Sequence, residues 1–364
     1  MYKFGESKKG RVLVAMSGGV DSSVAAALLV EQGYDVIGAT MQVWDYSAKE
    51  CDIQEGNGTC CSSTDVEDAR AVADRLEIPF YVINCEAKFQ AYVIDDFIGS
   101  YLEGRTPIPC VNCNTYLKFD HLIQKMKELD CDYLATGHYA RIDQSGGEAR
   151  LVSSEDSWKD QTYFLFTLDP SILPKLMFPV GHLKKPEVRK IAEEKELVVA
   201  KKKDSTGICF IGKTGHASFI EERVAPELIK KGVLRHYPDG EVLGHHDGIH
   251  QFTYGQRKGL GVATGEPVYV IKVDTDGTVW LGPESALYSK TLHLRRPNWL
   301  TDVKEGDEFT VKIRFQHKGS KARLVNKAKD EWDVEFQEPQ RAITPGQAAV
   351  FYRDRELIGG GWIA

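Results

Sequence analysis

The motif SGGVDS at residues 17–22 carries the residue types of a phosphate-binding loop. It follows an apolar run at 11–16 and precedes a helix-like stretch that Gly33 closes. In such a strand–loop–helix arrangement, backbone N–H groups converge with the positive end of the helix dipole, which favours an anion. The glycines let the backbone approach that anion closely, and Asp21 can help to hold a Mg²⁺ ion that bridges phosphates. The sequence therefore predicts a nucleotide phosphate site.

The residues at the end of this loop exclude one common class of phosphate-binding loop. It lacks the Lys-Ser/Thr ending of the common loop that cradles β- and γ-phosphates. It resembles instead the pyrophosphate loop of the PP-loop ATPases. That resemblance implies that ATP is cleaved between its α- and β-phosphates, that a substrate is adenylated and that pyrophosphate is released. The ATP-binding residues so implied are Ala15, Met16, Ser17, Gly18, Gly19, Val20, Asp21 and Ser22.

Two cysteine-containing segments offer activated sulfur. Cys110 and Cys113 form a CVNC motif in a proline-containing turn before a helix, whose N-terminus favours a thiolate. Cys209 follows the three lysines at 201–203, which also favour a thiolate. A thiolate is the better nucleophile and the better sulfur carrier. Packed structural thiols remain the alternative for each segment.

The other cysteine arrangements are less informative. The chain has no second CxxC pair that would indicate zinc, whereas Cys110, Cys113 and Cys209 together can ligate a [4Fe-4S] cluster with one iron left open. The two cysteines beside strand-like runs are predicted to be core residues, and the three in or beside a polar insertion at 49–59 stay unassigned. The first group is Cys85 and Cys131, and the second is Cys51, Cys60 and Cys61.

From residue 11 to about 140, apolar runs alternate between strand and helix patterns. Strands are expected at 11–16, 35–41, 80–84 and 133–136, and helices at 22–32, 64–76, 89–102 and 115–129. This βαβ series predicts an α/β fold with a doubly wound parallel sheet, whose ligands bind at the carboxyl ends of the strands. Ser17, Met41 and Gly137 lie at or just past such ends, so we expect them to converge on one nucleotide.

The second half of the chain has a different pattern. Glycine-rich, mixed segments from about 206 to 270 indicate a small central domain. Short alternating strands then predict a small C-terminal β-barrel. These strands are expected at 268–273, 278–281, 309–315, 322–324, 332–336 and 347–352. We therefore predict three domains, at 1–205, 206–275 and 276–364.

Composition restricts the class of protein. The 364 residues are 42% apolar and 27% charged with a net charge of −7, which argues against a chain devoted to non-specific nucleic-acid binding. Local basic groups at 184–203, 257–258 and 314–323 still leave an RNA substrate open, although each can also be a solvated face. The sequence offers no apolar stretch that could cross a bilayer and no secretory leader, so we expect a cytoplasmic protein with reduced cysteines.

Nine segments, in order along nearly the whole chain, resemble the tRNA-specific 2-thiouridylases. They are residues 17–22, 104–114, ATGHY at 135–139, KDQ at 159–161, FPVG at 178–181, 201–212, GQRKGLG at 255–261, and TPGQ at 344–347 with GGG at 359–361. The resemblance implies a PP-loop domain, a small central domain and a C-terminal β-barrel that contacts tRNA.

The resemblance also implies a reaction. ATP and Mg²⁺ activate the C2 oxygen of the wobble uridine in a tRNA, and a persulfide sulfur on Cys209 replaces it. Cys113 is the second catalytic cysteine, which releases the sulfur and forms a transient disulfide with Cys209. Backbone near Met41 and Gly137 holds the adenine.

Further residues match positions that contact the RNA in this family. Ile108, Pro109 and Cys110 match the segment that meets the target base, which must be flipped out to be reached. The positions that match other tRNA contacts are His138, Lys159, Asp160, Gln161, Arg314, Phe315 and Gln347. The implied partners are tRNAs with Glu, Gln and Lys anticodons and a cysteine desulfurase or sulfur-carrier protein.

This sequence departs from the family pattern at the target-base segment. Many members carry Asp where this chain has Cys110, and that Asp is a candidate general base that Cys110 can replace only as a thiolate. The same change supplies the third sulfur ligand of the cluster alternative. Ile108-Pro109 also stands where Asn-Pro is commoner.

Two functions from other classes compete with uridine thiolation. A PP-loop synthetase that adenylates a small metabolite would use the same loop without Cys113 or Cys209. A non-catalytic tRNA-binding or sulfur-carrier module would need neither Ser17 nor Asp21 for activity.

Overall fold

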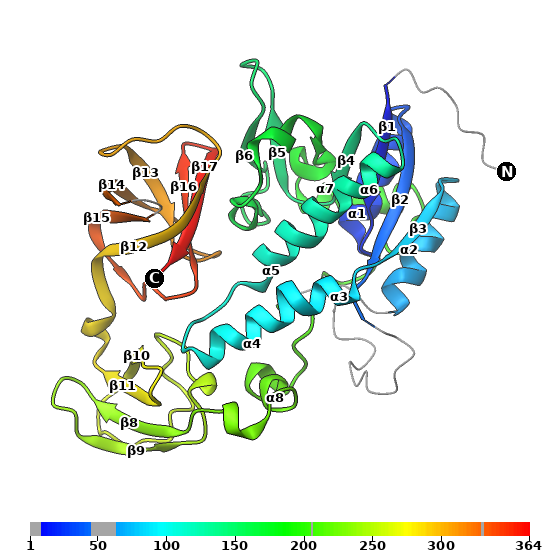
Figure 1. Ribbon diagram of the computed structural model, residues 1–364. Coiled ribbons are helices and arrows are strands. Elements are labelled where there is room, and N and C mark those ends of the chain that lie inside the picture. The colour runs from blue at the N-terminus through cyan, green and yellow to red at the C-terminus, as the bar shows by residue number, and fades with distance from the viewer. Residues whose placement is uncertain (1–8, 45–62, 205–206, 329–330) are drawn as a thin grey trace. The chain divides into compact units, whose positions relative to one another are not determined.

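The computed structural model describes residues 9–44, 63–204, 207–328 and 331–364 (Figure 1). The predicted insertion loop at 49–59, with Cys51, Cys60 and Cys61, lies outside the described residues. The chain divides into two compact units. The first comprises Met1–Val93, Cys110–Phe210 and Arg355–Leu357, and the second Ile94–Pro109, Ile211–Asp354 and Ile358–Ala364. No helix in the described ranges is long and apolar enough to cross a membrane.

A five-stranded parallel sheet with the strand order β3-β2-β1-β4-β7 forms the centre of the first unit. Its strands are β1 (Arg11–Ala15), β2 (Asp35–Gln42), β3 (Phe80–Asn84), β4 (Tyr133–Thr136) and β7 (Leu176–Met177). Its helices are α1 (Val20–Glu31), α2 (Ser63–Arg75), α3 (Glu86–Phe89), α6 (Leu122–Glu128) and α7 (Lys185–Glu194). This part of the chain also contains the short helix α5 (Pro109–Asn112) and a hairpin of two strands, β5 (Ala140–Asp143) and β6 (Arg150–Ser153).

The central strands are apolar throughout because they are covered on both faces. Val12, Leu13 and Val14 of β1 are fully buried, as expected for a parallel strand between two helical layers. Helix α1 is rich in alanine and leucine, and its apolar residues join those of α2 and α7 in one core against the sheet. Helix α6 packs on β1 and β4. This core fixes the edge of the sheet where β1 ends.

The strand order reverses beside β1. The chain moves outward through β1, β2 and β3 and then returns to place β4 on the other side of β1. Right-handed crossovers place the helices before and after this return on opposite faces, so the loops that follow β1 and β4 diverge and leave a crevice between them. The loop at 17–22 therefore lies at the topological switch point of the sheet.

The second unit contains a small four-stranded sheet and a barrel. The sheet has the order β10-β11-β8-β9 and is covered by buried Leu234, Ile249, Val270 and Leu281. Its strands are β8 (Gly232–His236), β9 (Val242–His246), β10 (Tyr269–Val273) and β11 (Thr278–Gly282). Two helices belong to this unit, α4 (Asp95–Leu102) and α8 (Gly215–Glu221). They meet through Phe97 and Phe219, whose ring centroids are 6.1 Å apart.

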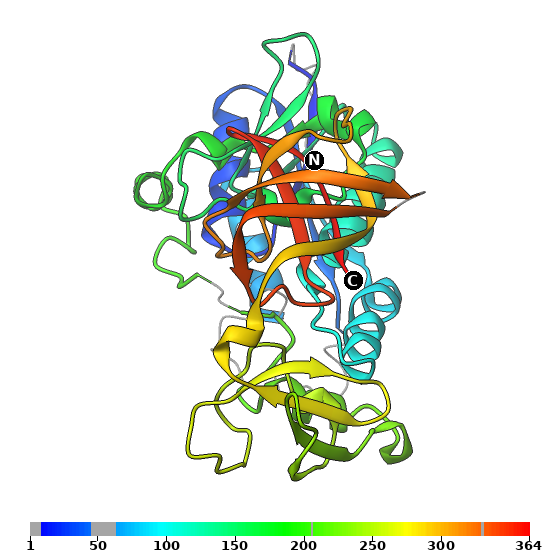
Figure 2. The same ribbon diagram turned by 90° about the vertical axis from the view of Figure 1, so that its left-hand side faces the viewer.

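Six antiparallel strands close into the barrel because β12 pairs with both β15 and β17 (Figure 2). The strands are β12 (Tyr288–Trp299), β13 (Glu308–Lys312), β14 (Ser320–Ala328), β15 (Glu331–Arg341), β16 (Ala348–Arg353) and β17 (Glu356–Ile363). Trp332, Val334 and Phe336 are buried, while Asp333 and Glu335 between them are not. This period of two is what a strand with one face on an apolar core requires.

The predicted fold class is confirmed, with a parallel-sheet domain, a small central domain and a C-terminal barrel. The exact domain boundaries remain a prediction. The sequence pattern groups the strands expected at 268–273 and 278–281 with the barrel. This grouping is wrong, because β10 pairs with β11 and β11 pairs with β8 of the small sheet. Apolar alternation is equally consistent with either sheet, so only the pairing partners separate them.

Two predicted helices are less regular than their sequence pattern indicates. The stretch expected as one helix at 89–102 contains a π-helical turn, Gln90–Ile94, between α3 and α4. The stretch expected at 115–129 begins earlier, with the π-helical segment Cys113–His121 before α6. Wide π-helical turns are rare and occur mostly at functional sites. The second of them starts at a predicted catalytic cysteine.

Candidate active site

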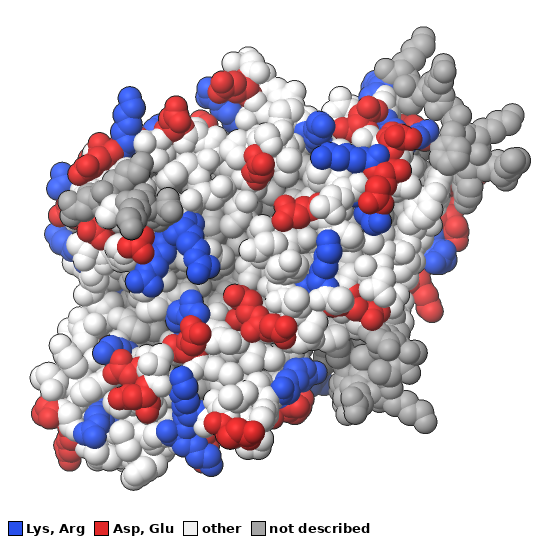
Figure 3. All heavy atoms as spheres, viewed as in Figure 1, with Lys and Arg blue, Asp and Glu red and all other residues white. Residues whose placement is uncertain are grey.

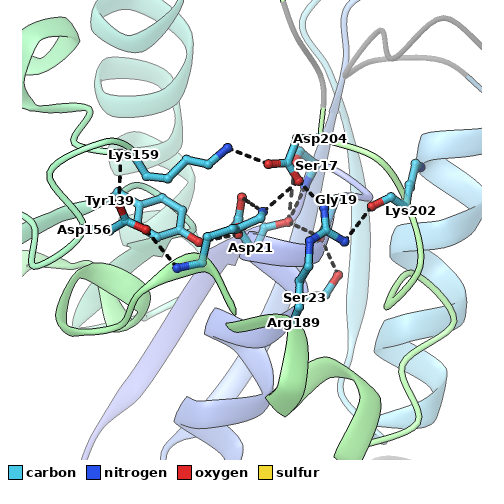
Figure 4. A network of polar contacts seen from close by, with 12 residues as sticks. Ser17, Gly19, Asp21, Ser23, Tyr139, Asp156, Lys159, Arg189, Lys202 and Asp204 are labelled. Carbon is cyan, nitrogen blue, oxygen red and sulfur yellow. Dashed lines mark hydrogen bonds and ion pairs between the residues drawn. The ribbon is translucent and has the colours of Figure 1, made fainter. Parts of the chain in front are cut away.

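The loop at 17–22 is held in shape by its own hydroxyl groups. The Ser17 backbone N–H donates to Ser22 Oγ at 3.1 Å, and the hydroxyls of Ser22 and Ser23 donate to the Gly19 carbonyl at 3.2 and 2.8 Å (Figure 4). Because Gly19 is the N-cap of α1, no side chain caps the first backbone N–H groups of that helix. A twelve-residue helix that begins at a glycine-rich turn is suited to an anionic ligand.

Two glycines bring other parts of the chain against this loop. Gly18 has a φ of +69°, and a Cβ there would lie 2.1 Å from the Asp65 carbonyl oxygen of α2. Gly137 directly follows β4, and a Cβ there would lie 2.5 Å from the Ser22 nitrogen at the start of α1. Both contacts are too short for any side chain. The loop that follows β1 and the residue that follows β4 therefore meet as closely as backbone permits. The contact of Gly137 with a nucleotide stays a prediction.

A charged network borders the loop. Lys185 Nζ donates to both carboxylate oxygens of Asp21 at 2.7 and 2.9 Å, and the Tyr139 hydroxyl donates to the same carboxylate at 2.9 Å. Lys185 also pairs with Asp204 at 3.0 Å. Burial and the neighbouring Asp21 charge raise the pKa of Tyr139 far above its ordinary value, so its hydroxyl keeps its proton.

Asp204 is the second centre of this network. Lys159 Nζ donates to it at 2.6 Å and Arg189 Nη2 at 2.5 Å, as Figure 4 shows. Burial raises the pKa of Asp204, but hydrogen bonds from Lys159 and Lys185 and their positive charges outweigh burial and lower it to about 2. The carboxylate is therefore ionised at neutral pH and bound to three cations.

The segment just before Asp204 is tied to the same loop. Lys202 Nζ donates to the Gly18 carbonyl at 3.0 Å and to Asp65 at 2.7 Å, and it also pairs with Asp68. Burial lowers the pKa of Lys202, while the two carboxylates more than offset this effect and raise it. The lysine is thus a fixed positive charge between α2 and the loop.

The two predicted catalytic cysteine segments approach α3 in the first unit. Cys113 is partly exposed and begins the π-helical segment Cys113–His121, which contacts α3. Cys209 is also partly exposed, and its neighbour Phe210 packs on Phe89 of α3 with ring centroids 5.8 Å apart. Both segments therefore reach the same single-turn helix.

Neighbouring contacts anchor the Cys113 segment. Asn114 is buried and its amide donates to the Phe164 carbonyl at 3.1 Å, while Thr115 bonds Thr167 at 2.6 Å. Cys110, on α5, is exposed. Within the described ranges, no group of three or more His, Cys, Asp or Glu side chains is arranged to hold a metal ion. In this arrangement Cys110, Cys113 and Cys209 do not form the ligand set of an iron–sulfur cluster.

The two cysteines predicted to be core residues, Cys85 and Cys131, are confirmed as buried. Burial raises the pKa of each thiol to about 11. Both therefore stay protonated at neutral pH and are poor nucleophiles, in contrast to the exposed or partly exposed sulfurs of the other two segments.

Four of the residues matched to tRNA contacts lie in the first unit, and one of them is Lys159, which binds Asp204. His138 is 8% exposed and bonds Thr136 at 2.7 Å, and burial followed by the charge of Lys118 lowers its pKa well below the ordinary value. Asp160 is buried and accepts bonds from Ser154 and Thr162. Gln161 accepts from the Tyr139 backbone N–H at 2.9 Å. Each of these groups positions the chain around Tyr139 and the phosphate loop.

The remaining matched residues lie in the second unit. Arg314 and Phe315 are exposed, and the Arg314 guanidinium donates to the Arg341 carbonyl at 3.2 Å. The Gln347 amide donates to the Thr106 and Pro107 carbonyls at 3.1 and 3.4 Å. The turn before β16 therefore supports the chain that leads into Ile108 and Pro109, both of which are buried.

Several site residues were missed by the sequence analysis. Lys185 and Lys202 were grouped with solvated basic faces, whereas both are ion-paired beside the loop. Tyr139 and Asp204 lie inside two of the segments that resemble the 2-thiouridylases, ATGHY at 135–139 and residues 201–212. This resemblance was the only sequence signal that they belong to the site. Trp158 is 93% exposed next to Lys159, and its backbone N–H is held by Asp156 at 3.1 Å. Its polar neighbours, EDS at 155–157 and KDQ at 159–161, were the sequence signal for this exposure.

A parallel sheet with an uncapped helix N-terminus at its switch point is the arrangement of a nucleotide-binding α/β domain, and the SGGVDS loop at that point is typical of the PP-loop class. The family described as tRNA methyl transferase HUP domain matches residues 10–213. The families described as tRNA methyl transferase PRC-barrel domain and aminomethyltransferase beta-barrel domain match residues 217–283 and 289–363. These matches cover the parallel sheet, the small central sheet and the barrel in turn.

Curated relatives match the whole length of the chain. The tRNA-specific 2-thiouridylase MnmA of Geotalea uraniireducens is 48% identical over 98% of this chain and 96% of its own. The enzymes of that name from Geobacter metallireducens and Clostridium perfringens are 47% and 46% identical, each over 98% of both chains. The chain belongs to the family of the tRNA-specific 2-thiouridylases.

Proposed function

We propose that this chain catalyses the ATP-dependent 2-thiolation of the wobble uridine of tRNA. The observation that carries this proposal is the full-length identity of 46–48% to relatives named for that activity. A phosphate loop at the switch point and two accessible cysteine segments that reach one helix fit the two halves of such a reaction.

The phosphate loop supplies the first half. Backbone N–H groups of residues 17–22 and the start of α1 bind the phosphates, and backbone at Ala15, Met16, Met41 and Gly137 holds the adenosine. The C2 oxygen of the uridine attacks the α-phosphorus of ATP, the bond to the β-phosphate oxygen breaks and pyrophosphate leaves. Adenylation turns a poor leaving oxygen into AMP, while the N3 proton is lost to solvent.

The cysteines supply the second half. A persulfide on Cys209 attacks C2 through its terminal sulfur, and AMP departs with the original oxygen. The Cys113 thiolate then attacks Sγ of Cys209, which breaks the S–S bond and leaves its electron pair on the sulfur that is now bound to C2. The products are 2-thiouridine, which regains its N3 proton, and a Cys113–Cys209 disulfide. A thiol reductant restores both thiols.

Magnesium and the substrate are held by different parts of the chain. One carboxylate, Asp21, together with phosphate oxygens is a donor set that suits Mg²⁺, which shields the charge of the phosphates when bound. Ile108, Pro109 and Cys110 meet the flipped target base. The other residues proposed to contact the tRNA are His138, Lys159, Asp160, Gln161, Arg314, Phe315 and Gln347.

The RNA interface is proposed to be local rather than spread over the surface. The face in Figure 3 carries acidic and basic side chains interspersed. Because tRNA binding displaces counterions from its phosphates, affinity should fall steeply as salt rises. A flat response to salt would argue against the basic groups at 184–203 and 314–323 as the binding surface.

The remaining partners follow from the chemistry. The persulfide requires a sulfur donor, for which we propose a cysteine desulfurase or a sulfur-carrier protein. The proposed substrates are the tRNAs with Glu, Gln and Lys anticodons, and a tRNA substrate places the chain in the cytoplasm.

The test is to incubate the protein with ATP, Mg²⁺, a sulfide source and unmodified tRNA, and to measure 2-thiouridine by mass spectrometry. Cys113→Ala and Cys209→Ala should each reduce product at least about 1000-fold, because each removes a group that makes or breaks a covalent bond. Cys131→Ala is the matched control, since it removes a buried, protonated thiol away from the loop, and it should keep activity.

Two outcomes would change the assignment. Product formed only after anaerobic iron–sulfur reconstitution, and lost in Cys110→Ala as well, would replace the persulfide by a cluster. ATP turnover without thiolated tRNA under either condition would favour a synthetase that acts on a small metabolite.

A further inference from the structure

Lys185 is shared by two carboxylates that belong to different parts of the site. Its Nζ lies 2.7 and 2.9 Å from the Asp21 oxygens and 3.0 Å from Asp204 Oδ1. Only 9% of the residue is exposed, so the ammonium group exchanges partners among protein and ligand groups rather than with bulk water. Asp21 belongs to the phosphate loop, whereas Asp204 lies five positions before Cys209. One side chain thus joins the nucleotide end of the site to the sulfur end.

The segment that leads to Cys209 depends on this network for its position. Arg189 binds the Asp204 carboxylate at 2.5 Å and the Lys202 carbonyl at 3.0 Å. Lys202 in turn binds the Gly18 carbonyl of the loop at 3.0 Å. Lys202 therefore attaches this segment directly to the loop, and Asp204 attaches it to the loop through Lys185. A movement of either attachment displaces residues 202–204, which precede the Cys209 segment in the sequence.

The charges of the network leave it responsive to an anion. Three cations, Lys159, Lys185 and Arg189, are balanced by three carboxylates. These are Asp21, Asp204 and Asp156, whose Oδ2 accepts from the Lys185 backbone N–H at 2.9 Å. A nucleotide triphosphate bound in the loop introduces further negative charge beside Lys185, and charges at these distances inside a protein interact strongly. The ligand then competes with Asp21 and Asp204 for the same ammonium group.

We propose that Lys185 is a positioning residue that couples nucleotide occupancy of the phosphate loop to the position of the Cys209 segment through Asp204. The position of the sulfur-bearing cysteine then depends on whether a nucleotide is bound. The proposal rests on the proposed function for the role of Cys209. Its test reads the thiol directly and requires neither tRNA nor a sulfur donor.

The test measures the alkylation rate of Cys209 by iodoacetamide with and without a saturating, non-hydrolysable ATP analogue and Mg²⁺. Cleavage after Lys203 and Lys213 gives a peptide of residues 204–213 in which Cys209 is the one cysteine, so its label is read separately by mass spectrometry. In the wild type the analogue should change the rate at least about fivefold, the lower end of coupling between two sites. In Lys185→Met the ratio should fall close to one, and Lys185→Arg should restore part of it.

Two further variants separate coupling from loss of folding or of nucleotide binding. Asp204→Asn keeps the loop and Lys185, so it should bind the analogue and still lose the change in alkylation. Lys190→Met is the matched control, because Lys190 lies on the same helix, is 76% exposed and pairs with Glu194. It should keep the full wild-type ratio.

A wild type whose Cys209 alkylation is unaffected by the analogue would overturn the proposal. So would a folded Lys185→Met or Asp204→Asn variant that binds the analogue and keeps the full ratio. Because these readouts do not depend on thiolation, they can succeed even if no 2-thiouridine is formed. Failure of this coupling is thereby distinguished from failure of the proposed function.

Discussion

The phosphate-loop edge of the first unit and the barrel of the second are stabilised by different interactions. Around the loop, carboxylates and cations such as Asp21, Lys185 and Asp204 are held at 2.5–3.0 Å in a partly buried network. The barrel interior is instead apolar, with Leu294, Val311 and Trp332 among its buried residues. The first arrangement can exchange partners when a charged ligand arrives, whereas the second is fixed by shape and exclusion of water.

This difference indicates which part of the protein exchanges its contacts during the reaction. Ion pairs have discrete alternative partners, and a triphosphate supplies such a partner at the loop. Closure removes the open strand edges of the barrel, so it presents its loops on a rigid support. We expect substitutions in the barrel core to affect stability and substitutions at the loop to affect ligand response.

The largest expected effect on stability is in the barrel core. Trp332→Ala removes a side chain that is 2% exposed and packs edge-on against Trp299. The loss of buried area and the remaining cavity should cost about 3–5 kcal/mol. Hydrogen exchange of barrel peptides, followed by mass spectrometry, measures this local loss.

The same experiment tests the independence of the two regions. Tyr288→Ala, an exposed aromatic residue on β12, is the matched control and should change stability by less than about 0.5 kcal/mol. Nucleotide affinity should be unchanged in both variants, since the loop lies within the first unit. A large loss of nucleotide affinity in Trp332→Ala would contradict the separation of roles.

At the loop edge, Gly137→Ala should cost about 1–3 kcal/mol, because its new Cβ would be forced to within 2.5 Å of the Ser22 nitrogen. The displacement of the α1 N-terminus should also weaken nucleotide binding, which isothermal titration measures. Gly212→Ala is the control, since nothing lies within 4 Å of its ideal Cβ position. Equal effects of the two substitutions would show that the close approach at Gly137 has no special role.

The charged network should make the first unit sensitive to acid. Asp204 has a pKa lowered to about 2 from the ordinary 3.8, so its stabilising effect is present above pH 3.8 and is lost as pH falls toward 2. Allowing for partial exposure, this amounts to about 1–2 kcal/mol. In Asp204→Asn the unfolding free energy should change less across that window. Urea titrations at a series of pH values measure this. The assignment is contradicted if the variant loses as much stability below pH 3.8 as the wild type does.

The smallest effect is expected on the barrel surface. Hydrogen bonds that His293 donates to Asp333 and Glu331 raise its pKa. Its contribution to stability is therefore present below the unfolded value near 6.5 and is lost as pH rises through the raised value. For this largely exposed group the contribution is about 0.5 kcal/mol. His293→Gln should therefore destabilise the barrel at pH 6 and have little effect at pH 9. A cost that persists at pH 9 would indicate a packing role instead.

Local sequence determined much of this protein. The apolar run of β1, the glycine-rich loop and the alanine-rich α1 specify a strand, a turn and a helix through their own backbone and side-chain preferences, and all three were predicted at nearly their observed positions. The burial of Cys85 and Cys131 also followed from adjacent strand patterns. The fold class was predictable for the same reason, since alternating elements and short strands each permit few architectures.

Tertiary structure alone decided which distant groups meet. Lys185 and Asp21 are 164 positions apart, and nothing near Lys185 distinguishes it from the exposed lysines on the same helix. The strands β10 and β11 have an alternation that suits either sheet, so the pairing of β11 with β8 had to come from the fold. Helical and strand periodicities are local properties, whereas ion pairs and strand partners depend on which surfaces the packed core brings together.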